Sequence, residues 1–265
     1  MKFKSVLGVD AAWTLAQPSG VALASDAGGA WRLVAAAPSY VSFNALAEGE
    51  PTIAPSRSGS PLNVPRLLAS SEKLYGQPVD LVAIDIPLAH GPITGRRVSD
   101  DAVSKAYGAR KCGTHSPSAW RPGKVSDDIK AGFDQAGYPL LTTSITTPGL
   151  IEVYPHPALL HLTKATERLP YKLSRIRGYW PATAAAERKA LLLKQWTRIV
   201  ALLDAQIGGV AEALPLPPVD SPGAELKGYE DMLDAVVCAW VAICALRGNA
   251  ERFGNHHSAI WIPNI

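Results

Sequence analysis

The sequence has few cysteines and lacks several motifs that identify large enzyme classes. Its three cysteines are an odd number and form no CxxC pair, which argues against a disulfide framework and against a structural zinc site. No GxSxG motif is present, so a serine hydrolase is disfavoured. The absence of a Walker A motif and of GxGxxG likewise disfavours P-loop and dinucleotide-binding enzymes.

Long apolar runs are also missing. No stretch approaches the roughly 18 consecutive apolar residues that a membrane span requires, and Asp10 interrupts the first apolar run too early for a signal peptide. Hydrophobic residues still make up 47% of the 265 residues, at a mean hydropathy of +0.05, which is enough to fill a core. We expect a cytoplasmic protein with no membrane segment, a single domain over residues 1–265 and an insertion at about residues 87–149.

The net charge of +3 is small, but the charges are unevenly distributed. Residues 161–198 contain nine basic and two acidic side chains, whereas residues 204–234 contain seven acidic and one basic side chain. A basic stretch followed by an acidic one is typical of a protein that binds a polyanion and holds a cation. Two solvated helical faces explain the same pattern equally well.

The pattern of apolar residues predicts an α/β protein with a mixed five-stranded sheet. Three strands joined by short connections predict an antiparallel meander, and a buried strand after a helix predicts a parallel neighbour. We expect strands at residues 4–10, 20–25, 31–37, 79–86 and 150–154, with IWIP at 260–263 as a possible last short strand. We expect a turn at residues 26–30 and a loop at 48–65. We place helices at 67–75, 99–109, 127–136, 157–164, 182–205 and 227–246, on both faces of the sheet.

Acidic residues occur where a buried element would otherwise be apolar. Asp10 and Asp85 end two strands, and a carboxylate there is costly unless it is paired or holds a metal. Asp231 and Asp234 interrupt an apolar helix at a spacing that puts both on one face. Glu152 interrupts the strand LIEVY. In such sheets ligands bind outside the carboxyl ends of the parallel strands, where these acids are expected to converge.

Converging carboxylates favour a bound cation. Two of them about 4 Å apart repel by roughly 4 kcal/mol at an effective dielectric constant of about 20, and oxygen-rich sites suit Mg²⁺ or Mn²⁺. Alternatively, these acids could have purely structural roles and bind no ligand. Asp10 could cap a turn, Asp85 could be a loop-entry acid, and Asp231 could be a first-turn acid that favours the helix dipole. Glu152 could instead pair with a basic residue of the insertion.

Several basic residues are candidates for phosphate binding. Those in the insertion could bind phosphate or could equally pair with Asp100, Asp101 and Glu152. Those in the YKLSRIR segment form a compact second group. His156, at a strand end, could act as a general base or could cap the next helix. The phosphate-binding candidates are Arg96, Arg97, Arg110, Lys172 and Arg175.

Five motifs together resemble a known family. GVD near the start, IDIP, EVYPHP, DMLDA and the closing IWIP are similar to the domain of unknown function 429 family, whose members are predicted nucleases of the ribonuclease H-like superfamily. The resemblance extends from Val6 to Pro263 and implies a ribonuclease H-like sheet with a long insertion after its fourth strand. It implies an acidic site of Asp10, Asp85, Glu152, Asp231 and Asp234.

The resemblance and the acidic pattern predict a metal-dependent nuclease or other phosphodiester hydrolase. In this hypothesis Asp10, Asp85 and Asp234 ligate Mg²⁺ or Mn²⁺, and the partner is a nucleic acid or another phosphate-bearing substrate. One alternative is a phosphotransferase or ATPase of the actin and sugar-kinase type. The segment between the first two strands has only Gly20, which counts against the phosphate hairpin of that group. The other alternative is a non-catalytic binding module on the same fold.

Overall fold

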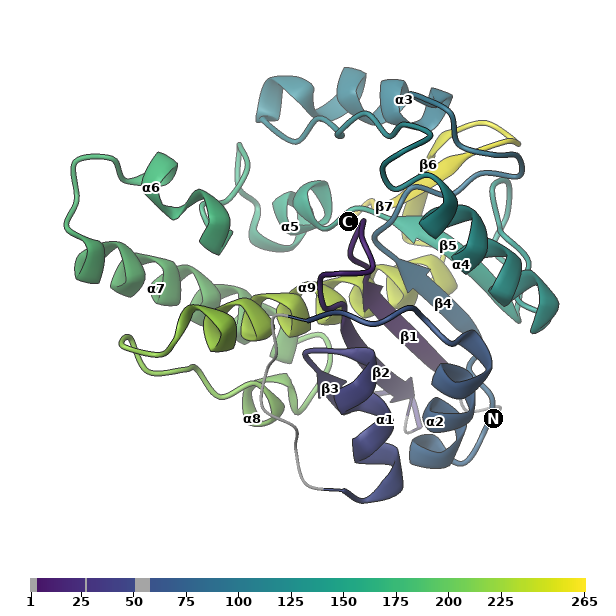
Figure 1. The fold of residues 1–265 in the computed structure, drawn as a ribbon, viewed down its shortest axis with the longest axis horizontal. Coiled ribbons are helices and arrows are strands. Elements are labelled where there is room, and N and C mark those ends of the chain that lie inside the picture. Colours follow the sequence, from purple (N-terminus) through teal and green to yellow (C-terminus); the bar gives the residue numbers. More distant parts are fainter. Residues whose placement is uncertain (1–3, 27, 51–57) are drawn as a thin grey trace.

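A computed structural model describes residues 4–26, 28–50 and 58–265 of the chain (Figure 1). Residues 51–57 of the predicted loop at 48–65 lie outside the described residues, and so does Ala27 of the predicted turn at 26–30. Within that turn, Gly28 and Gly29 have φ values of 79° and 102°. Residues with a Cβ atom rarely adopt positive φ values of this size, which explains why two glycines occupy this turn.

Seven strands of the described residues form one mixed sheet in the order β3-β2-β1-β4-β5-β7-β6. Strands β1, β2 and β3 are antiparallel, β4, β5 and β7 run parallel to β1, and β6 is antiparallel to β7. The strands are β1 (Ser5–Asp10), β2 (Gly20–Asp26), β3 (Trp31–Ala37), β4 (Leu81–Ile84), β5 (Gly149–Val153), β6 (Ala250–Gly254) and β7 (Ala259–Pro263).

The expected number of five strands is wrong, although the mixed α/β class is confirmed. The IWIP segment forms β7, which pairs with β5 and extends the sheet. Strand β6 was not predicted, because Glu251 and Arg252 are both exposed and break the apolar alternation that identifies a strand. An edge strand needs little apolar surface, so its sequence carries a weak signal.

Helices surround this sheet, and most lie where the sequence predicts them. Helix α1 was missed, although Ser39 caps its first turn by accepting a hydrogen bond from Ser42 N at 3.0 Å and Gly49 ends it at a φ of 73°. The helices are α1 (Tyr40–Glu48), α2 (Val64–Tyr75), α3 (Val98–Tyr107), α4 (Lys124–Gln135), α5 (Pro155–Thr163), α6 (Ile176–Tyr179), α7 (Ala185–Asp204), α8 (Val210–Ala213) and α9 (Gly223–Leu246), with 3₁₀ turns η1 (Gly108–Arg110) and η2 (Leu173–Arg175).

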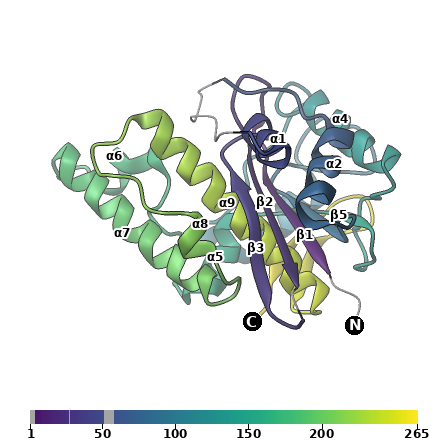
Figure 2. The same ribbon diagram turned by 90° about the horizontal axis from the view of Figure 1, so that it is seen from below.

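The two faces of the sheet are covered by different helices, as predicted. Figure 2 shows α5, α7 and α9 on one side of β1, β2 and β3, and α1, α2 and α4 on the other. Successive side chains of a strand point to opposite faces. Val6 therefore packs on the α9 side and Leu7 on the α2 side, so each face of the sheet has its own apolar core.

Residues of the long insertion extend the fold at one end of the sheet. Helix α3 packs against β6 and β7, and α4 packs against α2. Among the described residues, no helix combines the length and the apolar character needed to cross a membrane.

Helix α9 lies directly on the sheet because two glycines leave room for it. A Cβ added to Gly8 of β1 would come within 2.1 Å of the Ala235 carbonyl oxygen. A Cβ added to Gly20 of β2 would come within 2.0 Å of the Asp231 carbonyl oxygen. Gly20 thus serves the close approach of α9, and this approach brings the acids of the helix next to the strand ends.

Candidate functional site

The first component of the site is a pair of carboxylates at neighbouring strand ends. Asp10 is the last residue of β1, and Asp85 follows β4 directly. The Asp85 backbone N donates a hydrogen bond to the Val9 carbonyl oxygen at 2.9 Å, which fixes the two strand ends side by side. By the alternation of side chains, Asp10 shares a face with Val6 and Gly8, which is the face that α9 covers.

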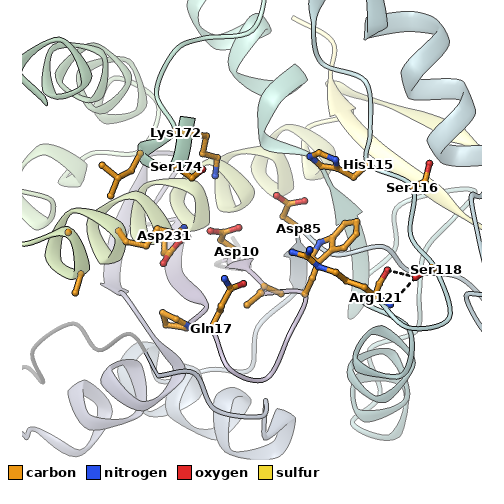
Figure 3. Close-up of a pocket in the computed structure, with 18 residues that line it drawn as sticks. Asp10, Gln17, Asp85, His115, Ser116, Ser118, Arg121, Lys172, Ser174 and Asp231 are labelled. Atoms are coloured by element: carbon orange, nitrogen blue, oxygen red, sulfur yellow. Dashed lines mark hydrogen bonds and ion pairs between the residues drawn. The ribbon is translucent and has the colours of Figure 1, made fainter. Parts of the chain in front are cut away.

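Three acids of α9 complete the cluster, and all are buried. Glu230, Asp231 and Asp234 are at most 2% exposed. Helix α9 begins at Gly223, so Asp231 is not in the first turn, and a role as a helix-dipole acid does not explain it. Figure 3 shows the side chains of Asp10, Asp85 and Asp231 gathered with Lys172 around one part of a cavity.

Two lysines are embedded among these acids. Lys172, just before η2, forms ion pairs with Asp234 and, at 3.7 Å, with Glu230. Lys227, one turn before the acids on α9, pairs with Asp231 and, at 3.1 Å, with Glu230. Lys172 was a candidate from the sequence, whereas Lys227 and Glu230 were not predicted. The i,i+3 and i,i+4 spacing from Lys227 is a helical ion-pair signal that could have revealed both.

The acids of the site fall into two groups. Engaged acids have hydrogen-bond or ion-pair partners for their oxygens, and open acids do not. Asp234 accepts a hydrogen bond from the Tyr171 hydroxyl at 2.8 Å in addition to its ion pair with Lys172. Asp231 keeps one buried oxygen, Oδ2, without a hydrogen-bond partner. Asp10 and Asp85 form no side-chain hydrogen bond and no ion pair within the described part of the chain. The open carboxylates are thus those of the two strand ends and half of Asp231.

Burial and mutual repulsion disfavour the ionised forms of Asp85, Asp231 and Asp234. Burial raises the pKa of Asp85 well above its ordinary value, and the negative charge of Asp10 raises it further, while Lys172 opposes the shift. The pKa of Asp231 is raised well above its ordinary range by burial and by Asp10, against the effect of Lys227. Burial also raises the pKa of Asp234 to about 6, although Lys172 opposes this. A cation placed among them would relieve this repulsion.

Glu152 does not face this cluster. It alternates with Ile151 and Val153, which pack on the α9 side, so its side chain leaves β5 on the opposite face. Both of its oxygens accept hydrogen bonds from the Arg97 guanidinium, at 2.5 and 2.7 Å. Arg97 also pairs with Asp100 at 2.8 Å. The structure thus gives Glu152 the ion pair with a basic residue of the insertion that the sequence left open. Burial raises the pKa of Glu152 to about 7, and Arg97 opposes that shift.

The basic residues expected to bind phosphate are placed in different environments. Arg97 is buried against two carboxylates, and Arg96 pairs with Asp101 at 2.6 Å. Arg110 donates to the carbonyl oxygens of Ala165 and Thr166. Their donors are therefore already engaged, mainly in the pairings that the sequence offered as the alternative. Lys172 is also engaged, in its ion pairs with Asp234 and Glu230, but it lines both cavities beside Asp85. Arg175 lines the smaller cavity.

Two adjoining cavities open at the strand ends. The larger has a volume of about 920 Å³ and contains Asp10, Asp85 and Asp231 in its wall, with Trp13 and Arg121 at its side. The smaller has a volume of about 350 Å³. They share a set of residues, so a single ligand can extend from one to the other: Trp13, Asp85, His115, Lys172, Ser174 and Lys227. Trp13, His115 and Arg121 were not predicted, because no pattern in the sequence connects them to the acids.

The donor set at the strand ends fits a hard divalent cation with few protein ligands. The described residues hold no group of three or more acidic, histidine or cysteine side chains arranged to bind a metal by themselves. Mg²⁺, however, is commonly held by one or two carboxylates together with water and substrate phosphate. Asp10 and Asp85 supply two open carboxylates, and Asp231 supplies an unpartnered oxygen in the same cavity wall. Asp234 has both oxygens engaged and would need Lys172 to withdraw.

Comparison with known proteins gives one match. Residues 139–259 match the model of a family described as "Protein of unknown function (DUF429)". The matched segment contains Lys172 and the acids of α9, whereas Asp10 and Asp85 precede it. No curated protein and no solved structure matches the chain. The match agrees with the resemblance carried by the EVYPHP and DMLDA motifs, both of which lie within residues 139–259.

Proposed function

We propose that this protein is a metal-dependent phosphodiester hydrolase, with nucleic acid as the first substrate class to test. The observation that carries the proposal is the pair of open carboxylates at adjacent strand ends, Asp10 and Asp85, in the wall of a cavity of about 920 Å³. Both residues are partly buried, and two neighbouring carboxylates without a cationic partner repel each other, so their position in this wall favours a bound cation.

The chain's own residues suggest a division of roles. Asp10 and Asp85 would hold the cation, which would supply Lewis-acid polarisation and would activate water for attack on phosphorus. Lys172 and Lys227 hold the acids of α9 in place, since each lysine bridges two of them. Arg121, exposed at the side of the cavity and unpaired with any acid of the described residues, is placed to contact a polyanionic substrate.

The fold class that accompanies this proposal is ribonuclease H-like. Its support is the order and direction of β3-β2-β1-β4-β5, in which three antiparallel strands are followed by parallel ones. The two further strands, β7 and β6, extend this core at one edge. In that arrangement the first and fourth strands are neighbours, and both end in the acids that the family resemblance assigns to the site.

The first test is calorimetric binding of Mn²⁺ and of Mg²⁺ to the native protein, to Asp10→Asn and to Asp220→Asn. Asp220 is an exposed acid that lines neither cavity, so its variant controls for the loss of one charge. We expect binding to the native protein and to Asp220→Asn, and at least a tenfold loss in Asp10→Asn, equal to about 1.4 kcal/mol.

The second test is hydrolysis of single-stranded and duplex DNA and RNA, and of a small activated phosphodiester, in the presence of Mn²⁺. Activity should disappear in Asp10→Asn while its circular dichroism spectrum stays native. Full activity of a properly folded Asp10→Asn variant would contradict the proposal.

A further inference from the structure

Arg168 has a buried donor that none of the described residues satisfies. It lies in the segment between α5 and η2, where its backbone N donates to the Arg110 carbonyl oxygen at 2.9 Å. Its side-chain Nε is buried and has no hydrogen-bond partner. No carboxylate within the described ranges lies at ion-pair distance from it. A buried guanidinium donor without an acceptor is costly, so the position calls for an anion.

Other cationic or donor groups surround the same space. Arg168, Arg175, His115 and His156 all line the cavity of about 350 Å³. Arg175 and His115 also have no carboxylate within ion-pair distance among the residues that the structure describes. His156 is only 8% exposed, and its Nδ1 has no hydrogen-bond partner. Arg168 and His156, whose buried Nε and Nδ1 have no hydrogen-bond partner among the described residues, therefore line the same cavity.

The positive charges around this cavity contribute to the lowered pKa values of its two histidines. Burial lowers the pKa of His156 well below its ordinary value, and the charges of Arg168 and Lys172 lower it further. Burial and the charges of Arg168 and Arg175 also lower the pKa of His115. A neutral imidazole donates one hydrogen bond and accepts one, so His156 can donate to a ligand through the ring nitrogen that carries the proton.

The acids that line this cavity do not cancel the positive charge. Glu152 and Asp100 are paired with Arg97, and Glu230 is shared by Lys172 and Lys227. Asp85 is the remaining acid of the wall, and burial keeps its pKa raised. The wall therefore carries five basic and four acidic side chains, and the basic ones without an acidic partner among the described residues are Arg168 and Arg175.

We propose that Arg168, Arg175, His115 and His156 form a binding site for a phosphate group. Arginine presents paired N–H donors that match phosphate oxygens, and two arginines beside a neutral histidine supply directed donors on several sides. The inference extends the proposed function, because the cavity meets the strand-end carboxylates at Asp85. A phosphate held here would be a second phosphate of the substrate, next to the one that is hydrolysed.

The test is calorimetric binding of inorganic phosphate in the presence of a chelator and without added metal, so that it does not depend on hydrolysis. The variants are Arg168→Gln and Arg175→Gln, with Arg177→Gln as the matched control. Arg177 is exposed like Arg175, lies two residues further along the chain and lines neither cavity. Arg175 is exposed, so its variant should fold even if Arg168→Gln does not.

We expect the dissociation constant for phosphate to rise at least about tenfold in both variants and to stay unchanged in Arg177→Gln. No phosphate binding by the native protein, or equal binding by all variants, would overturn the inference while leaving the metal site untouched. Phosphate binding without metal binding would instead keep this site and overturn the hydrolase.

A second arm identifies the source of the phosphate. An oligonucleotide with a 5′-phosphate is compared with the same oligonucleotide carrying a 5′-hydroxyl, both in competition with inorganic phosphate. Stronger competition by the phosphorylated form assigns the site to the substrate. Equal competition with intact phosphate binding assigns it to free phosphate, the same chemistry from another source.

Discussion

Asp85→Asn should stabilise the metal-free protein while removing its response to metal. Asp85 and Asp10 end neighbouring parallel strands. Such strands lie about 4.8 Å apart, and two unit charges at that distance repel by about 3.5 kcal/mol at an effective dielectric constant of about 20. Lys172 offsets part of this repulsion. We therefore expect a net gain of about 1–2 kcal/mol in the free energy of unfolding, or about 2–8 °C in Tm.

The gain should depend on pH in a defined direction. The pKa of Asp85 is raised in the folded protein relative to the unfolded chain, because burial and Asp10 disfavour the ionised form. The native protein therefore loses stability as the pH rises through the folded-state pKa, and this loss is absent below the unfolded-state value. The advantage of Asp85→Asn should be small near pH 4 and complete once Asp85 is ionised in the native protein, at a pH well above about 4.

The assay is thermal unfolding of the native protein, Asp85→Asn and Asp220→Asn across this pH range, with and without Mn²⁺. Saturation at about 100 times the dissociation constant should stabilise the native protein by about 2.7 kcal/mol and leave Asp85→Asn nearly unchanged. Asp220→Asn should behave as the native protein does. A destabilised Asp85→Asn at neutral pH, or equal stabilisation of both proteins by Mn²⁺, would refute the reasoning.

Three further predictions concern the metal, the helix and the buried ion pair. Mn²⁺ affinity should fall as the pH is lowered, because protons compete with the metal for Asp85. Because the pKa of Asp85 is raised, the fall should begin at a pH well above the ordinary pKa range of carboxyl groups. Titration calorimetry at several pH values measures the affinity, and an affinity that does not change with pH would contradict the prediction. Gly8→Ala should lower the free energy of unfolding by about 1–3 kcal/mol, because the added Cβ would lie 2.1 Å from the Ala235 carbonyl oxygen and displace α9. Urea unfolding measures this loss. An unchanged urea midpoint would show that the helix can shift without cost. Arg97→Gln should cost about 3–5 kcal/mol, because two buried carboxylates lose their partner. Arg96→Gln is the control, because the ion pair of Arg96 with Asp101 is exposed and its loss should cost under about 1 kcal/mol. Similar losses in both variants would contradict the role given to the buried ion pairs of Arg97.

The local sequence determined the elements that carry the acids. Apolar runs ending in an acid predict strands that end near Asp10 and Asp85, and both acids lie at strand ends in the structure. The apolar helix with an i,i+3 acid pair is α9, and both acids are buried. These features follow from periods of 2 and 3.6 residues, which are properties of the chain over short distances.

The tertiary structure alone decided which charges meet. Lys172 reaches Asp234 across 62 residues, and Arg97 reaches Glu152 across 55 residues. No periodicity in the sequence relates such positions. The choice between phosphate binding and ion pairing for Arg97 therefore stayed open until the side of β5 from which Glu152 emerges was known.

The sequence also does not show which buried polar groups lack a hydrogen-bond partner. The unsatisfied donors of Arg168 and His156 come from the packing around them, since burial removes water and no acceptor approaches. In the sequence, Arg168 is one of the nine basic residues of 161–198, and His156 is a candidate only because it lies at a strand end. The order of residues thus determined where strands, helices and acids occur. Only the packing of distant segments decided which of the charges are neutralised and which remain available to a ligand, because Coulomb interactions depend on separation and burial in space and not on position along the chain.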